Sequence, residues 1–246
     1  MTTPCPSILL VDDDIDICEN MADILSDMGY RVNVAHDGMS ALELVRLQPY
    51  DIALLDLKMP GMNGLELYRE IKRLRPGTVA MLVTAHATQA TTDEALTAGT
   101  SHVLSKPVDM PRLLGLIDES LGQPLLLVVD DDRDLCDNLW DLLHGHGYRV
   151  SLAHDESEAA GHLRETTRVV LIDMRLPIGD GGSVFHLVRE TNPRARTLLM
   201  TGWRAETSPL IDRLRAEGAD AVCYKPFDVP RLLETLKSLA GDQDQV

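Results

Sequence analysis

The segment Ile8-Leu-Leu-Val-Asp-Asp-Asp14 occurs a second time, 118 residues further along the chain, as Leu126-Leu-Val-Val-Asp-Asp-Asp132. In both places a short apolar run ends directly in three carboxylates. Other segments repeat at nearly the same distance, among them Gly29-Tyr-Arg-Val32, Ala35-His-Asp37 and Lys106-Pro107, which return as Gly147-Tyr-Arg-Val150, Ala153-His-Asp155 and Lys225-Pro226. Solenoid repeats have periods of only ~20–50 residues, so we predict two copies of one domain, residues 1–122 and 123–246.

Each copy alternates short apolar runs with amphipathic stretches. The runs expected to form strands in the first copy are Ser7–Val11, Arg31–Val34, Ile52–Leu55, Val79–Val83 and His102–Ser105. Most of these runs are almost continuously apolar, which is typical of parallel strands that are covered on both faces. Five strand–helix units within about 120 residues therefore predict a doubly wound α/β fold with right-handed crossovers.

The composition is that of a globular protein, with 44% hydrophobic and 25% charged residues, which argues against a disordered or collagen-like chain. Lysine and arginine number 23 against 39 aspartates and glutamates, so the net charge is −16. Nucleic acids and anionic membranes repel a polyanion of this size. No apolar run approaches the ~18 residues of a membrane span, and the N-terminus lacks the features of a signal peptide. We expect a cytoplasmic protein that binds neither nucleic acid nor membrane, with its four cysteines reduced.

Carboxylates directly follow two of the predicted strands. Asp12 and Asp13 come after the first strand, and Asp56 comes after the third. The carboxyl ends of parallel strands form the ligand-binding edge of an open sheet, so these side chains are expected to share one crevice. Clustered carboxylates repel one another, and a divalent cation is the usual compensation. Because oxygen ligands suit Mg²⁺, the sequence predicts a magnesium site.

A hydroxyl and an ammonium group are expected beside this crevice. Thr84 follows the fourth predicted strand, and Lys106 follows the fifth. This set of groups suits a phosphoryl group transferred to Asp56, because the metal and Lys106 would neutralise the phosphoryl oxygens and Thr84 would donate a hydrogen bond. No general base is needed, since a carboxylate is already ionised.

Four motifs in each half carry a resemblance to a known family. In the first half they are Val11-Asp-Asp-Asp14, Leu55-Asp-Leu-Lys-Met-Pro-Gly-Met-Asn-Gly64, Val83-Thr-Ala85 and Ser105-Lys-Pro107. In the second half they are Val129-Asp-Asp-Asp132, Ile172-Asp-Met-Arg-Leu-Pro-Ile-Gly-Asp-Gly181, Met200-Thr-Gly202 and Tyr224-Lys-Pro226. Each half resembles a receiver domain of the two-component response regulators, and the resemblance covers essentially the whole chain.

The resemblance implies a flavodoxin-like (βα)5 fold in each half, with a parallel five-stranded sheet in the order 2-1-3-4-5. It also implies that each half accepts a phosphoryl group from a histidine kinase or a histidine phosphotransfer protein while one Mg²⁺ is bound. The phosphorylated chain would then change its binding to a downstream protein. Such a chain is not an enzyme, beyond catalysing its own phosphorylation and dephosphorylation.

The resemblance assigns roles to residues that match the motif positions of the family. The phosphoacceptors would be Asp56 and Asp173. The hydroxyl and lysine of each site would be Thr84 with Lys106, and Thr201 with Lys225. Besides the two phosphoacceptors, the metal ligands would be Asp13 and Asp131 directly, Asp12 and Asp130 largely through water, and the backbone carbonyls of Lys58 and Arg175.

Several neighbouring residues are expected to have structural roles instead. Asp14 and Asp132 lie in the first turn of a predicted helix, so helix capping is a better interpretation than metal binding. His36 and His154 are interpreted as loop residues and not as ligands. Cys18 and Cys136 lie on apolar helical faces and are expected in the core.

The sequence departs from the family pattern at two positions. Family receivers usually carry Tyr or Phe three residues before the lysine, and here those positions are Val103 and Val222. A valine is too short to swing between an inner and an outer site. We therefore expect the signal to leave through the loops after the third and fourth strands, at Lys58–Gly64 and Ala85–Thr92.

The residues that flank the approach to the phosphate also differ between the halves. They are Lys58 with His86 in the first half, and Arg175 with Trp203 in the second. Hydrolysis of an aspartyl phosphate needs a water in line with the P–O bond. Bulky Trp203 would obstruct that water, so we predict slower loss of phosphate from the second site.

Two other functions remain open at this point. The triplet Asp130-Asp-Asp132 after an apolar strand also fits the start of a haloacid-dehalogenase-like phosphatase, although the duplication and the Asp56 and Asp173 motifs argue against it. The second alternative is a scaffold in which one receiver does not accept phosphate. No output domain is expected in this chain, because only a short polar tail follows Leu239.

Overall fold

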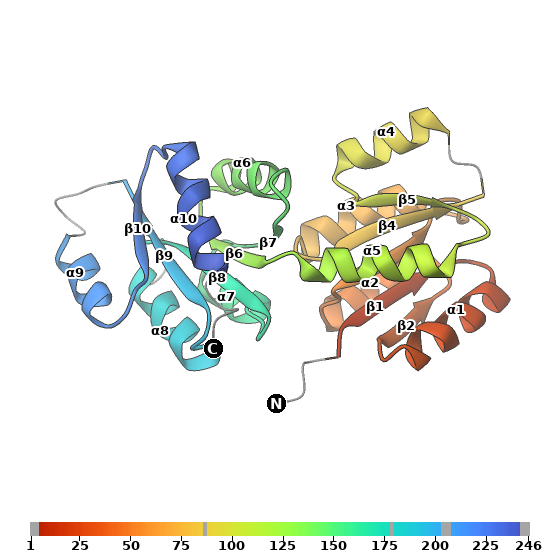
Figure 1. Cartoon of the computed structure of the whole chain (residues 1–246), viewed down its shortest axis with the longest axis horizontal. Helices are drawn as coiled ribbons and strands as arrows, with labels where there is room; N and C mark the ends of the chain where they lie inside the picture. Colours follow the sequence, from red (N-terminus) through yellow and green to blue (C-terminus); the bar gives the residue numbers. More distant parts are fainter. Residues whose placement is uncertain (1–4, 86–87, 178–179, 203–207, 242–246) are drawn as a thin grey trace. The chain divides into compact units, whose positions relative to one another are not determined.

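The computed structural model describes residues 5–85, 88–177, 180–202 and 208–241. The chain divides into two units, Met1–Gly122 and Gln123–Val246. Each unit contains one five-stranded parallel sheet, and helices lie on both faces of the sheet (Figure 1). The doubly wound α/β fold predicted for both halves is confirmed.

The first unit has the predicted strand order, β2-β1-β3-β4-β5, and all its neighbouring strands are parallel. Its elements are β1 (Ser7–Val11), α1 (Ile15–Asp27), β2 (Arg31–Ala35), α2 (Gly38–Leu47), β3 (Ile52–Asp56), α3 (Gly64–Leu74), β4 (Val79–Thr84), α4 (Gln89–Ala98), β5 (His102–Ser105) and α5 (Met110–Gly122).

The second unit repeats this arrangement, with the strand order β7-β6-β8-β9-β10. Its elements are β6 (Leu125–Val129), α6 (Arg133–His144), β7 (Arg149–Ala153), α7 (Glu156–His162), β8 (Thr167–Asp173), α8 (Gly181–Thr191), β9 (Arg196–Thr201), α9 (Ser208–Ala216), β10 (Ala221–Tyr224) and α10 (Val229–Gly241).

Strands β2, β3 and β4 each extend one residue further than the sequence pattern predicted, to Ala35, Asp56 and Thr84. Asp56 is in register with Val83, and Thr84 is in register with Ser105. The neighbouring strand continues the hydrogen-bond ladder, so these polar residues still belong to the sheet. Their backbones are therefore held by strands and not by loops.

The two faces of β1 are buried in different hydrophobic cores. Ile8 and Leu10 pack with Cys18 of α1 on one face, whereas Leu9 and Val11 pack toward α2 and α3 on the other. Full burial of a leucine or isoleucine side chain stabilises the fold by about 1.5–3 kcal/mol. The acidic residues that follow β1 are thus attached to a strand that is held firmly on both faces.

Both helices that follow the acidic triplets begin with a side-chain cap. Asp14 Oδ1 accepts the backbone N–H of Ile17 at 3.1 Å, and Asp132 Oδ1 accepts that of Leu135 at 3.0 Å. The predicted capping role of Asp14 and Asp132 is confirmed. The first two carboxylates of each triplet remain for other contacts.

The loop between β3 and α3 is fixed by a capping box. The Asn63 side chain accepts the N–H of Glu66, and Glu66 Oε2 accepts the N–H of Asn63 at 3.0 Å. At the next residue, Gly64, a Cβ atom would overlap the backbone carbonyl of Asp56. The loop can pack this closely against the end of β3 only because Gly64 has no side chain.

The four cysteines are free thiols, and Cys18 and Cys136 are buried as expected. In the part of the chain that the structure describes, no helix is long and apolar enough to cross a membrane.

Candidate functional site

Three carboxylates meet at the carboxyl edge of the first sheet. Asp12 and Asp13 follow β1, and Asp56 ends β3, the neighbouring strand. Each of the three offers an oxygen within 4.8 Å of the others. Asp12 and Asp56 are only 3% and 6% exposed, whereas Asp13 is open to solvent. The structure thus places these side chains in one acidic cleft, with Asp13 at its open side.

The ammonium group of Lys106 lies between the two buried carboxylates. Its Nζ atom is 2.6 Å from Oδ2 of Asp12 and 3.3 Å from Oδ1 of Asp56. Lys106 follows β5, and β4 lies between β5 and β3 in the sheet. The long lysine side chain therefore reaches across one strand to join the cleft.

The second unit has the same arrangement. Asp130, Asp131 and Asp173 form the acidic group, with Asp130 and Asp173 buried and Asp131 exposed. Lys225 Nζ lies 2.6 Å from Oδ2 of Asp130 and 3.3 Å from Oδ1 of Asp173. The two clefts are matched in both their residues and their ion-pair distances.

Burial and repulsion between neighbouring carboxylates raise the pKa of the aspartate that ends each central strand. Desolvation raises the pKa of Asp56, the charges of Asp12 and Asp13 raise it further, and the ammonium of Lys106 only partly offsets them. Burial alone would lower the pKa of Lys106, but its hydrogen bonds and charge interactions with Asp12 and Asp56 outweigh burial, so that pKa is raised. The ionised cleft holds more negative charge than one lysine neutralises.

In the second unit the pKa values of Asp173 and Lys225 are shifted in the same directions as those of Asp56 and Lys106. Desolvation raises the pKa of Asp173, and the charge of Asp130 adds to it against the opposing effect of Lys225. The pKa of Lys225 is raised because its contacts with Asp130 and Asp173 outweigh burial. Each lysine is therefore fully charged near neutral pH.

The donor set of each cleft fits a hard divalent cation. Its clustered side-chain ligands are carboxylates, and one of them lies at a solvent-exposed side where water can complete a coordination sphere. Mg²⁺ prefers one or two carboxylates together with several waters. A divalent ion would also offset the uncompensated negative charge in the cleft.

The predicted hydroxyl groups lie at the same edge of each sheet. Thr84 ends β4 beside the Asp56 strand and is fully buried, and Thr201 ends β9 and is 1% exposed. Thr84 is in register with Ser105, which immediately precedes Lys106. Each threonine therefore lies on the strand between the one that carries the central aspartate and the one that precedes the lysine.

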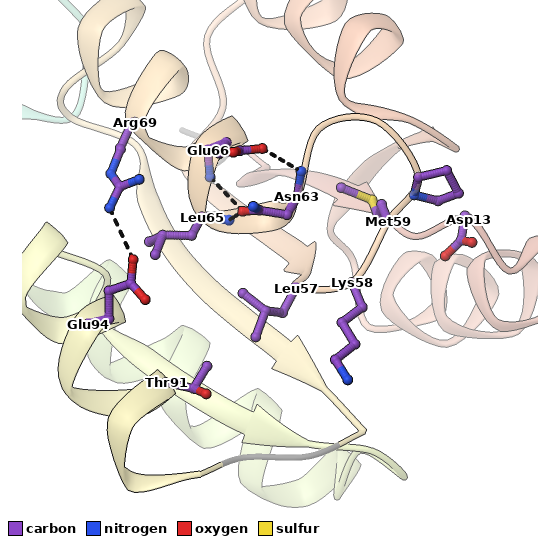
Figure 2. Close-up of a pocket in the computed structure, with 11 residues that line it drawn as sticks. Asp13, Leu57, Lys58, Met59, Asn63, Leu65, Glu66, Arg69, Thr91 and Glu94 are labelled. Carbon is purple, nitrogen blue, oxygen red and sulfur yellow. Dashed lines mark hydrogen bonds and ion pairs between the residues drawn. The ribbon is translucent and has the colours of Figure 1, made fainter.

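Lys58 lies in the loop after β3 and lines a cavity of about 720 Å³ in the first unit (Figure 2). Asp13 and Lys58 lie toward one end of this cavity, and the ion pair of Arg69 with Glu94, 3.3 Å apart, lies toward the other. A group that approaches the acidic cleft from this cavity meets the negative side chain of Asp13 and the positive side chain of Lys58. Arg175 is the exposed counterpart of Lys58 in the second unit.

His36 and His154 lie in loops, as expected, but each also contacts an acidic residue of a cleft. His36 Nδ1 is 3.2 Å from the backbone oxygen of Asp12, and His154 Nδ1 is 3.0 Å from that of Asp130. The sequence contains one signal for this contact, because both histidines repeat at the same distance from the acidic triplets.

Val103 and Val222, at the positions where the family usually has an aromatic residue, are half-buried and pack against the core of their units. His86 and Trp203, which carry the prediction of unequal phosphate loss, lie outside the described residues, so that prediction stands on the sequence alone. Of the predicted loop Ala85–Thr92, residues 86 and 87 also lie outside them, and the part from Gln89 onward belongs to α4.

Comparison with known proteins gives the same result for both units. The sequence model of the family described as "Response regulator receiver domain" matches residues 8–118 and 126–237. The chain is 35% identical over 239 residues to the response regulator receiver protein Anae109_2439 of Anaeromyxobacter sp. (strain Fw109-5), and the match covers 96% of each chain.

Two further similar proteins match about half of the chain. The transcriptional regulatory protein ZraR of Klebsiella oxytoca is 39% identical over 119 residues, which are 48% of this chain and 27% of ZraR. A crystal structure of a CheY-like response regulator receiver domain protein from Methanospirillum hungatei JF-1 is 35% identical, with a TM-score of 0.45. That match covers 47% of this chain and 92% of the other.

Proposed function

The chain belongs to the response regulator receiver domain family, with one receiver domain in each half, and on that basis we propose that each half accepts a phosphoryl group on a single aspartate. The acceptors are Asp56 and Asp173. The observation that carries this proposal is a buried carboxylate at the end of a central strand, 3.3 Å from an ammonium group and beside two further carboxylates, in both units.

The carboxylate of Asp56 is the nucleophile. One of its oxygens forms a bond to the phosphorus atom of a donor while the bond from phosphorus to the leaving atom breaks, and the leaving group keeps that electron pair. Lys106, already held between Asp12 and Asp56, lies where it can neutralise a phosphoryl oxygen. Thr84 supplies a hydroxyl donor from the adjacent strand.

The positions of these groups account for catalysis. The ammonium of Lys106, 3.3 Å from Asp56, favours the ionised form of this carboxyl group, and a carboxylate needs no base to remove a proton before it attacks. The sheet fixes Asp56 and Thr84, and the reach of Lys106 across β4 fixes the ammonium. Because the donors are already oriented, little reorganisation is needed as charge develops on the phosphoryl group.

The cofactor in this proposal is one Mg²⁺ in each half. Asp13 and Asp56 would hold it with the backbone carbonyl of Lys58, and Asp12 would act largely through water. In the second half these roles fall to Asp131, Asp173, Arg175 and Asp130. When bound, the ion supplies positive charge beside the phosphoryl oxygens.

The partners in this proposal are a histidine kinase or a histidine phosphotransfer protein as donor, and a downstream protein as target. The chain would act as a switch whose binding to the target changes on phosphorylation. It would turn over no substrate beyond its own phosphorylation and dephosphorylation. The matched lysine–aspartate distances in the two clefts favour two active receivers over a scaffold with one inactive half.

Intact-mass spectrometry after incubation with Mg²⁺ and acetyl phosphate tests this proposal. The expected gain is two phosphoryl groups for the parent chain, one for Asp56→Asn and one for Asp173→Asn, and none for the double variant. A parent chain that never gains mass contradicts the proposal. Steady release of phosphate from a generic phosphomonoester would instead favour the phosphatase alternative.

A further inference from the structure

The peptide bond that joins Asp12 to Asp13 is held by side chains from two other elements. Its carbonyl oxygen, which belongs to Asp12, lies 3.2 Å from Nδ1 of His36 and 3.4 Å from Sγ of Cys18. Cys18 comes from α1, and His36 follows β2. Burial raises the pKa of the Cys18 thiol to about 11, so the thiol keeps its proton at neutral pH and can donate it.

The second unit holds the corresponding peptide bond in the same way. The carbonyl oxygen of Asp130 lies 3.0 Å from Nδ1 of His154 and 3.3 Å from Sγ of Cys136. Burial likewise raises the pKa of the Cys136 thiol, to about 12. The two units therefore share both contacts to this carbonyl.

The backbone explains why this carbonyl needs a side-chain donor. The N–H of Asp12 donates to the carbonyl of Ala35 at 3.3 Å, which continues the β1–β2 ladder. In a parallel ladder the next donor to the Asp12 carbonyl would be the N–H of Asp37. The chain turns away at Asp37, which caps α2 by accepting the N–H of Ser40. The imidazole of His36 supplies a donor at this point.

This peptide plane joins the Cα atoms from which the first two acidic side chains extend. The carbonyl belongs to Asp12, and the nitrogen of the same plane belongs to Asp13. The carboxylate of Asp12 is also held: its Oδ1 accepts the backbone N–H of Asp14 at 3.1 Å, and its Oδ2 accepts from the ammonium group of Lys106 at 2.6 Å. A donor that holds the Asp12 carbonyl therefore restrains the backbone from which both carboxylates extend.

The contact also fixes the protonation of the histidine ring. A carbonyl oxygen only accepts hydrogen bonds, so Nδ1 of His36 must carry a proton, and the same holds for His154. When either imidazole is neutral, Nε2 is therefore the unprotonated nitrogen.

We propose that His36 and His154 are positioning residues for phosphoryl transfer, each holding the peptide bond that joins the first two aspartates of its cleft and so restraining the backbone from which their carboxylates extend. The proposal rests on the proposed function of the clefts. It assigns the histidines no contact with the phosphoryl group and no role as metal ligands.

The first test measures the tautomer, which requires neither metal nor phosphate. Long-range ¹H–¹⁵N correlation spectra of the metal-free chain are recorded above the pH at which histidine is usually charged. We expect the Nδ1–H tautomer for both His36 and His154. An Nε2–H tautomer at either residue overturns the proposal for that unit.

The second test compares a variant that keeps the donor with one that lacks it. In His36→Asn the side-chain amide nitrogen is the same number of bonds from Cβ as Nδ1, whereas His36→Leu has no donor. Both are made in the full chain carrying Asp131→Ala and Asp173→Asn, so that only the first cleft is intact. Circular dichroism and thermal melts of each variant verify that it folds.

Mg²⁺ affinity by calorimetry and the rate of phosphorylation by acetyl phosphate are then measured for both variants. We expect His36→Leu to weaken Mg²⁺ binding by about 10-fold or more and to slow phosphorylation mainly at low Mg²⁺, with recovery at high Mg²⁺. In His36→Asn the Mg²⁺ affinity and the phosphorylation rate should both stay within about threefold of those of the chain with His36 intact. Equal effects of the two substitutions, or no change in His36→Leu, overturn the positioning role. If the parent chain itself binds no Mg²⁺, the proposed function fails, and the tautomer measurement still decides whether the histidine holds the peptide.

Discussion

Lys106 Nζ lies 3.3 Å from Oδ1 of Asp56, although Asp56 ends β3 and Lys106 follows β5, which is not its neighbour in the sheet. The same separation joins Lys225 to Asp173 in the second unit. In both units the lysine spans the intervening strand and meets a buried carboxylate whose pKa is raised by desolvation.

Removal of the ammonium group should slow phosphorylation of the first half. In Lys106→Met the side chain keeps much of its length but loses its charge, so a developing phosphoryl oxygen has one donor fewer. We expect about a 10²-fold lower rate of mass gain from acetyl phosphate, measured in an Asp173→Asn background. Lys72→Met, on α3, is the matched control and should leave the rate unchanged. A Lys106→Met rate within threefold of the background would contradict the assigned role.

Removal of the charge on Asp56 should stabilise the metal-free protein. In Asp56→Asn a buried carboxylate that is repelled by Asp12 becomes neutral, while Lys106 keeps its 2.6 Å contact with Asp12. We expect the free energy of unfolding in EDTA to rise by about 1 kcal/mol or more at neutral pH. Urea unfolding measures this gain, and a loss of stability in Asp56→Asn would show that the carboxylate is favourable in the apo cleft.

The gain in the free energy of unfolding from Asp56→Asn should become smaller as the pH falls. A raised pKa means that the folded state binds the proton more tightly than the unfolded chain, in which the ordinary value is 3.8. The penalty from the ionised Asp56 is therefore present above the folded pKa and is lost as the pH falls through that pKa toward 3.8. The difference between variant and parent in urea unfolding should be largest near neutral pH. A stability difference that grows under acid conditions would contradict a raised pKa of Asp56 in the folded state.

Magnesium should stabilise the chain through the exposed aspartates. At a free Mg²⁺ concentration 100 times the dissociation constant, binding stabilises a unit by about 2.7 kcal/mol. We expect a rise in melting temperature on replacing EDTA by Mg²⁺, and loss of most of that rise in the Asp13→Ala, Asp131→Ala double variant. Asp23→Ala with Asp141→Ala, on the exposed faces of α1 and α6, is the control for a general charge effect. An equal loss in both pairs would argue against a specific site.

The substitution Gly64→Ala should disturb the cleft by displacing the loop between β3 and α3. A Cβ atom at this position would overlap the backbone carbonyl of Asp56, so the loop after β3 has to move. We expect a loss of about 1–3 kcal/mol in stability together with slower phosphorylation of Asp56. Gly115→Ala, in α5 with open space around its Cβ, should cost nothing and can stabilise by up to about 1 kcal/mol. Similar stability of the two variants would contradict the close approach at Gly64.

Much of the fold could be predicted from local patterns. The apolar runs predict β1 and β5 with their observed bounds, and the acidic residues before the helices are correctly interpreted as caps. The predicted ends of β3 and β4 are one residue short, because a polar residue such as Asp56 does not look like part of a strand. Its place in the sheet depends on pairing with Val83, which comes from a different part of the chain.

The composition of the cleft could be predicted from the sequence, whereas its contacts could not. The positions of Asp12 and Asp56 at strand ends indicate a shared crevice, because the carboxyl ends of parallel strands meet at one edge of the sheet. That Lys106 lies closer to Asp12 than to Asp56 depends on side-chain packing between β1, β3 and β5. The hydrogen bond from His36 to the Asp12 carbonyl depends on where β2 ends and α2 begins, which hydrophobic periodicity does not determine.

The location of the phosphoryl group tests the central claim most directly. After incubation with Mg²⁺ and acetyl phosphate, borohydride reduction converts an aspartyl phosphate to homoserine, which peptide mass spectrometry can locate. We predict homoserine in place of Asp56 and of Asp173, and at no other acidic residue. Modification at other carboxylates, or none at these two in a chain that binds Mg²⁺, would contradict the account.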